Sequence, residues 1–104
     1  MKVLIANRGE IARRIERTCQ RLGHQVVGIW VAGDTGSEPP VLDGDVVTVA
    51  SYLDQAAIID AARSVSADAV HPGFGFLAEN AEFAQGVIDA GLTWIGPRLS
   101  LIHI

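Results

Sequence analysis

The sequence predicts an α/β domain: a doubly wound parallel sheet of about five strands with helices on both faces. Short aliphatic runs alternate along the chain with helical patterns of about 10–15 residues, which is typical of successive right-handed β-α-β units. The first run is apolar at every position, as expected of a strand buried on both faces of a parallel sheet. Glycine, proline and asparagine residues separate these segments and mark their boundaries.

The first part of the chain predicts one complete β-α-β unit. A strand is predicted at residues 3–6, and Asn7 and Gly9 lie in the break that follows it. Glu10 lies in the first turn of the next helix, where the macrodipole favours an anion, and Gly23 provides the stop. The second strand is predicted at residues 25–31. The apolar positions of the helix recur at helical spacing: Ile11, Ala12, Ile15, Cys19 and Leu22.

The rest of the chain repeats the alternation after a loop. Residues 33–40 (GDTGSEPP) have the composition of a loop throughout. Asp54 lies near the start of the next predicted helix, Gly91 closes the one after it, and Gly96-Pro97 stops the last strand. The predicted elements are strands at 46–49, 69–71 and 92–95 and helices at 53–65 and 77–90.

Composition limits the class of protein. At 104 residues, with 49% hydrophobic and 19% charged residues, the chain has the composition of one ordinary globular domain. Its net charge of −4 argues against nucleic-acid binding, and no apolar run approaches the ~20 residues of a membrane span. The single cysteine excludes an internal disulfide and fits a cytoplasmic protein, as does the absence of a signal-peptide pattern at the amino terminus.

Residues 71–76 (HPGFGF) are the most informative segment of the chain. They follow a predicted strand and precede a helical pattern, and in open α/β sheets the carboxyl ends of the strands border the ligand crevice. Pro72 and Gly73 would set the geometry of the loop, because proline ends the strand ladder and glycine allows positive φ and close approach of the backbone. Aromatic rings between the glycines place flat apolar faces beside exposed amides. We interpret this segment as a ligand-binding loop.

Blocks along the chain resemble the amino-terminal domain of biotin carboxylase, as found in acetyl-CoA, propionyl-CoA and pyruvate carboxylases. They are residues 2–12 (KVLIANRGEIA), 51–53 (SYL), 71–80 (HPGFGFLAEN), 83–84 (FA) and 94–97 (WIGP). Their order and spacing carry the resemblance from Lys2 to Pro97.

The resemblance implies a Rossmann-like domain that precedes an ATP-grasp fold. The whole enzyme, a carbon–nitrogen ligase, uses ATP, bicarbonate and Mg²⁺ to carboxylate biotin held by a carrier protein or domain. The family's nucleotide-binding, metal-binding and catalytic residues lie in later domains. We therefore assign no catalytic residue or metal ligand here, and expect the chain alone to be inactive and to bind no cofactor tightly.

For the loop, the resemblance implies a biotin-binding role. Phe74 takes the aromatic position beside the biotin ring, where relatives often have tyrosine, and Gly75 offers a backbone group to the ureido moiety. Phenylalanine keeps the flat face but lacks the hydroxyl. His71 is interpreted as a packing or hydrogen-bonding residue rather than a proton-transfer group, and Cys19 as a core residue.

The chain departs from the family pattern at two places. The loop at residues 33–45 is shorter than is usual in the family and lacks its basic and histidine residues, so no role is carried across it. We expect the family domain to cover residues 1–97. Residues 98–104 (RLSLIHI) are expected to be an apolar tail foreign to the family, from a truncated or mistranslated terminus.

Arg14, Arg17 and Arg21 share one face of the first predicted helix. They either form a solvated face, partly paired with Glu10 and Glu16, or belong to a subunit interface, in which arginine is enriched. The resemblance favours a homodimer contact, because in bacterial relatives this helix lies near one.

Other functions remain open at the level of the sequence. Gly73-x-Gly75-x-x-Ala78 fits a relaxed dinucleotide fingerprint, although it follows the fourth strand rather than the first. The loop could also be a purely structural turn. The chain could instead begin another ATP-grasp enzyme, such as a carbamoyl phosphate synthetase, or be a free-standing regulatory nucleotide-binding module.

Overall fold

The computed structural model describes residues 1–31, 44–74, 77, 78 and 80–96, and confirms the predicted doubly wound α/β fold. The strands form one parallel sheet in the order β3-β2-β1-β4-β5. The elements in chain order are β1 (Lys2–Ile5), α1 (Gly9–Arg21), β2 (Gln25–Val31), β3 (Asp45–Val49), α2 (Gln55–Ser64), β4 (Ala69–His71), α3 (Ala81–Asp89) and β5 (Thr93–Trp94).

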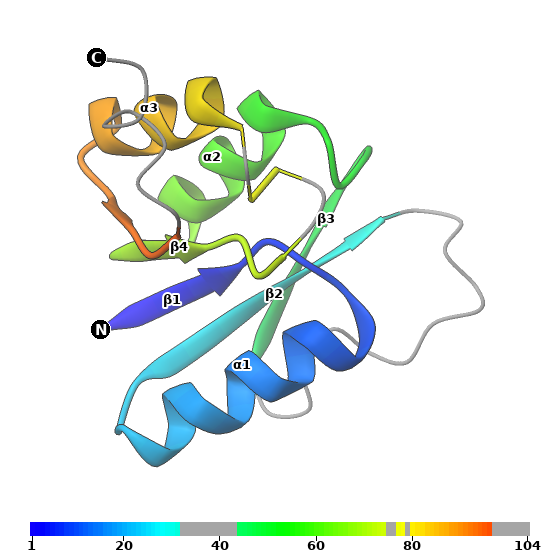
Figure 1. Cartoon of the computed structure of the whole chain (residues 1–104), viewed down its shortest axis with the longest axis vertical. Coiled ribbons are helices and arrows are strands. Elements are labelled where there is room, and N and C mark those ends of the chain that lie inside the picture. The colour runs from blue at the N-terminus through cyan, green and yellow to red at the C-terminus, as the bar shows by residue number, and fades with distance from the viewer. Residues whose placement is uncertain (32–43, 75–76, 79, 97–104) are drawn as a thin grey trace.

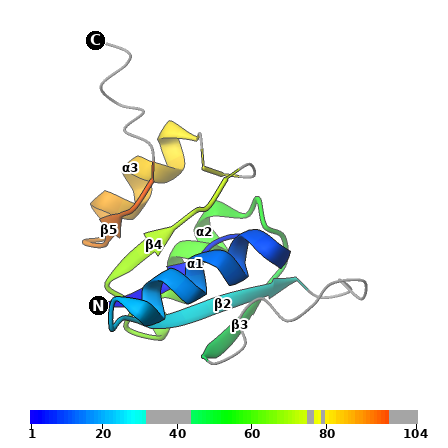
Figure 2. The same ribbon diagram turned by 60° about the horizontal axis from the view of Figure 1, so that its bottom comes forward.

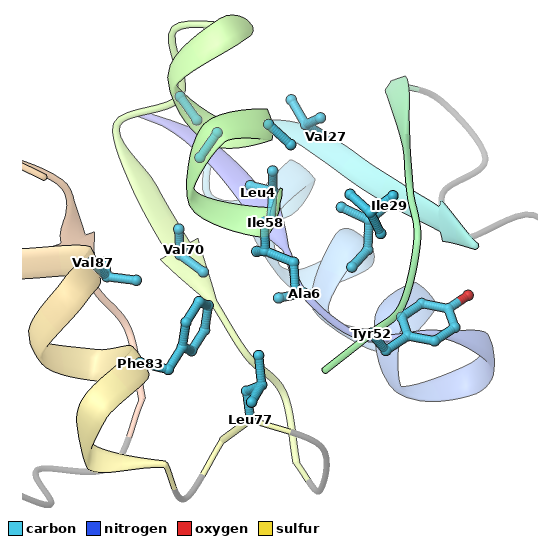
Figure 3. Close-up of a cluster of buried hydrophobic side chains, with 14 residues drawn as sticks. Leu4, Ala6, Val27, Ile29, Tyr52, Ile58, Val70, Leu77, Phe83 and Val87 are labelled. Carbon is cyan, nitrogen blue, oxygen red and sulfur yellow. The ribbon is translucent and has the colours of Figure 1, made fainter. Parts of the chain in front are cut away.

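Helices cover both faces of the sheet. Figure 1 shows α1 on one face and α2 with α3 on the other, and Figure 2 shows the same arrangement from a second direction. Successive side chains of β1 alternate between these layers, as the pleat of a strand requires. Val3 and Ile5 pack on the α1 side with Ala12 and Cys19. Leu4 belongs to the larger cluster on the α2–α3 side (Figure 3).

Two helices begin later than the sequence pattern predicted, because capping side chains fix their first turns. The Asp54 carboxylate accepts from the N–H of Ala57 at 3.1 Å, so α2 begins at residue 55 rather than 53. The Asn80 side chain accepts from the N–H of Phe83 at 2.9 Å, so α3 begins at residue 81 rather than 77. The apolar residue Leu77 that extended the pattern lies in a buried turn.

The strand predictions need smaller corrections. β2 and β4 have the predicted bounds. β1 lies one residue earlier than predicted, β3 includes one residue more, and β5 is limited to Thr93–Trp94. Gly23 ends α1 in the left-handed conformation, with φ of +82°. The predictions for residues 33–40 and 98–104 lie outside the described residues.

The buried face of α1 differs from the prediction at two positions. Glu16, expected to pair on the surface, is only 2% exposed, while Leu22, the last residue of the apolar helical pattern, is 65% exposed. Glu16 follows Ala12 by four residues and precedes Cys19 by three, so it lies on the stripe that faces the sheet. Gln20 Nε2 donates to its carboxylate at 3.4 Å. Helix geometry placed Glu16 in the interior despite its charge.

Among the described residues, no helix has both the length and the apolar composition to cross a bilayer.

Candidate functional site

The carboxyl ends of β1 and β4 lie side by side at the centre of the sheet. Ile5 pairs with His71, and the N–H of Ala6 donates to the carbonyl of His71 at 2.9 Å. From β1 the chain runs through α1 to β2, whereas from β4 it runs through α3 to β5 on the other side (Figure 1). The chain leaves these neighbouring strands in opposite directions. In open α/β sheets such a switch point borders the ligand crevice, so the candidate site is built here.

Asn7 links the two chain segments that leave this edge. Its side chain is fully buried, and its Nδ2 donates to the carbonyl of Pro72 and to the carbonyl of Phe74, both at 2.8 Å. Its Oδ1 accepts from the N–H of Arg8 at 2.8 Å. One buried amide therefore connects the turn after β1 to the loop after β4, 65 and 67 residues further along the chain.

Gly73 packs directly against that amide, in a backbone conformation that favours glycine. Its φ is +67°, as the predicted role in loop geometry requires. A Cβ at this position would lie 2.8 Å from Asn7 Nδ2 and 2.8 Å from Ile11 Cγ2. The loop therefore needs glycine here for both its conformation and its close approach to the turn.

His71 has the hydrogen-bonding role that the sequence analysis gave it. Its half-buried ring accepts from the N–H of Gly73 through Nδ1, at 3.1 Å. A neutral ring that accepts at Nδ1 carries its proton on Nε2. Burial lowers the pKa of His71 below the ordinary value of about 6.5, because the imidazolium form would lose solvation.

We expect His71 to make the stability of the chain depend on pH. The unfolded state, with the higher pKa, binds the proton first, so this stabilisation is complete above about pH 6.5 and declines as the pH falls through the folded-state pKa. His71→Asn is the matched control, since the amide oxygen can accept from the Gly73 N–H and does not titrate. Thermal unfolding between about pH 7.5 and about pH 5 should show a larger decrease in midpoint for the wild type. Parallel pH profiles would exclude His71 as the source.

Phe74 presents its ring to solvent at the end of this loop. The side chain is 68% exposed, although its carbonyl is held by Asn7. The ring borders an apolar groove of about 680 Å³ between the loop, the sheet and α1. Other residues that line the groove are Met1, Val3, Ile11, Arg14, Ile15, Thr18, Cys19, Leu22, His24, His71, Gly73 and Ile95. Gly75, the second predicted biotin-binding residue, lies outside the described residues.

The second sequence block that carried the resemblance also reaches this edge of the fold. The guanidinium carbon of Arg8 lies 5.9 Å from the centre of the Tyr52 ring, within the range of a cation–π contact. Tyr52 is buried on the α2–α3 side of the sheet (Figure 3). The turn after β1 therefore contacts both the segment before α2 and the loop after β4.

The three arginines of the predicted interface lie on the exposed surface of α1. Arg14, Arg17 and Arg21 are all exposed, and Arg14 borders the groove. Arg17 forms an ion pair with Glu10 at 3.2 Å, as expected for a partly paired surface. Cys19 is buried, as predicted, and burial raises the pKa of its thiol because the thiolate would lose solvation.

Asn7 was not predicted as a site residue. The sequence feature that could have identified it is a polar side chain directly after a buried strand and just before a helix. That residue was interpreted only as a break in the strand. Within the described residues, no group of three or more His, Cys, Asp or Glu side chains could hold a metal ion.

The whole chain can be compared with known protein families. The family model described as "Biotin carboxylase, N-terminal domain" matches residues 1–102. The chain belongs to this family. Membership confirms the resemblance from the sequence and favours a biotin carboxylase over another ATP-grasp enzyme.

Individual biotin carboxylases match nearly the whole chain. The biotin carboxylase of Haemophilus influenzae is 44% identical over 109 residues, which cover 99% of this chain and 24% of the relative. The biotin-dependent acyl-coenzyme A carboxylase alpha3 subunit of Mycobacterium leprae is 48% identical over 103 residues, covering 92% of this chain and 17% of the relative. The chain therefore spans about a quarter or less of these curated relatives.

Solved structures of biotin carboxylases share the fold. The biotin carboxylase subunit of a pyruvate carboxylase superposes with a TM-score of 0.85 at 45% identity, over 97% of this chain and 24% of that one. The biotin carboxylase domain dimer of the Hydrogenobacter thermophilus 2-oxoglutarate carboxylase superposes with a TM-score of 0.84 at 41% identity. The match covers 97% of this chain and 23% of that one. That structure is a complex with MgADP, ADP and bicarbonate.

Proposed function

We propose that this chain is the amino-terminal part of an ATP-dependent biotin carboxylase, which carboxylates carrier-bound biotin with bicarbonate. The observation that carries the proposal is the family match over residues 1–102, combined with coverage of only 24% of the Haemophilus influenzae enzyme. Such a parent would belong to a biotin-dependent acyl-CoA or keto-acid carboxylase. The ATP-grasp and carboxy-terminal domains and the biotin carrier are its proposed partners.

Within that enzyme, we propose that Phe74 and Gly75 contribute to the biotin site. Phe74 supports this role because its ring is exposed at the switch point, beside an apolar groove, while its backbone is held in place. A flat apolar face of this kind fits the fused rings of biotin. Gly75 is proposed from the resemblance alone. ATP and Mg²⁺ would be held by the later domains, so the chain alone is proposed to be inactive and to bind neither tightly.

The proposal for Phe74 can be tested in a chimera, in which residues 1–96 replace the corresponding part of the Haemophilus influenzae biotin carboxylase. Phe74→Ala should raise the KM for free biotin by about tenfold, because one aromatic contact contributes about 0.5–1.5 kcal/mol beyond its burial. The KM for ATP should stay within about twofold, which is well below the ~1.4 kcal/mol of a tenfold change. Steady-state kinetics with each substrate varied separately measures both.

Phe74→Tyr is the matched control for this experiment, since it keeps the flat face and adds the hydroxyl that relatives often carry. It should retain biotin use close to that of the unsubstituted chimera. Equal losses for biotin and ATP in Phe74→Ala, or no loss for biotin, would contradict the assignment of the loop to the biotin site.

We also propose that Arg14, Arg17 and Arg21 contribute to a homodimer interface of the parent enzyme. Their common exposed face on α1 supports this, as does the dimer formed by the related 2-oxoglutarate carboxylase domain. Arg14 and Arg21 are exposed on the same helix face as Arg17, and arginine is enriched in protein interfaces.

A further inference from the structure

We infer that Asn7 is a positioning residue, which holds the loop Pro72–Phe74 and with it the Phe74 ring in the geometry that substrate binding requires. The inference rests on the proposed function of the loop and extends it to a residue in a different part of the sequence. Asn7 lies in the turn after β1, where its side chain is buried from solvent.

The hydrogen bonds of Asn7 use both ends of its amide group. A primary amide has two N–H donors in one plane, and here Nδ2 donates to the Pro72 carbonyl and the Phe74 carbonyl, both at 2.8 Å. These two carbonyls belong to residues on either side of Gly73. Asn7 therefore fixes the loop at two points around its turn, rather than at one end.

The orientation of the amide is determined by its third partner. Oδ1 lies 2.8 Å from the N–H of Arg8, which can only donate. A rotated amide would place Oδ1 against two carbonyl oxygens and Nδ2 against an N–H, which would repel at all three contacts. The network is thus satisfied in one orientation only, and the turn after β1 sets the position of the loop.

The backbone conformation of the loop allows both hydrogen bonds from the Asn7 amide. At Gly73 the φ of +67° turns the backbone so that the carbonyls of its two neighbours both reach Nδ2. The Phe74 carbonyl and ring belong to the same residue, so displacement of the carbonyl also moves the exposed ring. Precise placement matters for binding and catalysis, because a misplacement of about 1 Å can reduce the rate by about a hundredfold.

The first arm of the test measures loop geometry in the 104-residue chain. Asn7→Asp preserves the shape of the side chain but removes both donors, and Asn7→Ala removes the group. In NMR spectra the ¹³C signals of the Pro72 and Phe74 carbonyls should shift in both variants, because each carbonyl loses a hydrogen bond. Val27→Ala, which shortens a buried β2 side chain, is the control for general destabilisation and should leave both signals in place.

The second arm measures kinetics in the chimera with the Haemophilus influenzae enzyme. Both Asn7 variants should reduce kcat/KM for free biotin by about tenfold to a hundredfold, with the KM for ATP within about twofold. Val27→Ala should affect the two substrates equally. This split between substrates is the readout that a merely structural role would not produce.

Each remaining outcome overturns the inference in a recognisable way. Unshifted carbonyl signals would show that Asn7 does not hold the loop. Shifted signals with unchanged biotin kinetics, or parallel losses for biotin and ATP, would show that holding the loop does not position the site. Phe74→Ala in the same chimera separates these results from failure of the proposed function, since only that failure leaves Phe74→Ala with normal biotin kinetics.

Discussion

Replacing Gly73 with alanine should lower the free energy of unfolding by about 2–5 kcal/mol. A left-handed backbone costs a non-glycine residue about 1–2 kcal/mol, and the φ here is +67°. The new Cβ would also lie 2.8 Å from side-chain atoms of Asn7 and Ile11, and overpacking in a tight interior costs about 1–3 kcal/mol. Equilibrium denaturation in urea, followed by circular dichroism, measures the change.

Gly91→Ala is the matched control for this substitution. Gly91 follows α3 with φ of +83°, and a Cβ there would meet no atom within 4 Å. Gly91→Ala should therefore lower the free energy of unfolding only by the cost of the left-handed backbone, about 1–2 kcal/mol. The difference between the stability losses of Gly73→Ala and Gly91→Ala measures how tightly the loop is packed against the turn after β1. Equal losses at the two glycines would contradict the close packing of the loop on Asn7.

The architecture was predictable from the sequence because it depends on short-range patterns. Continuous aliphatic runs of the kind at residues 3–6 identify buried parallel strands, and their alternation with helices fixes right-handed crossovers. Two errors arose at single side chains. Asn80 caps α3, so the helix begins later than the apolar pattern predicted. Glu16 is buried because helix periodicity places it toward the sheet, although its charge predicted a surface position.

The candidate site was only partly predictable, for a physical reason. Glycine and proline indicate particular backbone conformations by themselves, so the loop at Pro72 and Gly73 could be recognised from the local sequence. The residue that holds the loop could not, because Asn7 is 65 residues away from Pro72 and its role depends on the adjacency of β1 and β4. A polar residue after a strand has many uses, and only the fold shows which carbonyls it reaches.

Phe83→Ala should be the most destabilising of the substitutions considered, with a loss of about 3–5 kcal/mol. Phe83 is fully buried, and in Figure 3 its ring lies beside Val70 and Leu77 on the α3 side of the sheet. It also forms an edge-to-face contact with Trp94, with ring centres 5.6 Å apart at 84°. Domains of this kind are stable by only about 5–15 kcal/mol, so urea denaturation should show a greatly reduced midpoint.

Phe74→Ala removes the same atoms nine positions earlier in the chain and serves as the control. Because the Phe74 ring is 68% exposed, the free energy of unfolding should change by no more than about 0.5 kcal/mol. The two phenylalanines should therefore separate stability from function: Phe83→Ala lowers stability and would affect biotin and ATP use together, while Phe74→Ala affects biotin use alone. A stability loss at Phe74 comparable to that at Phe83 would mean that the Phe74 ring belongs to the core. Its effect on biotin would then follow from loss of the fold rather than loss of a contact.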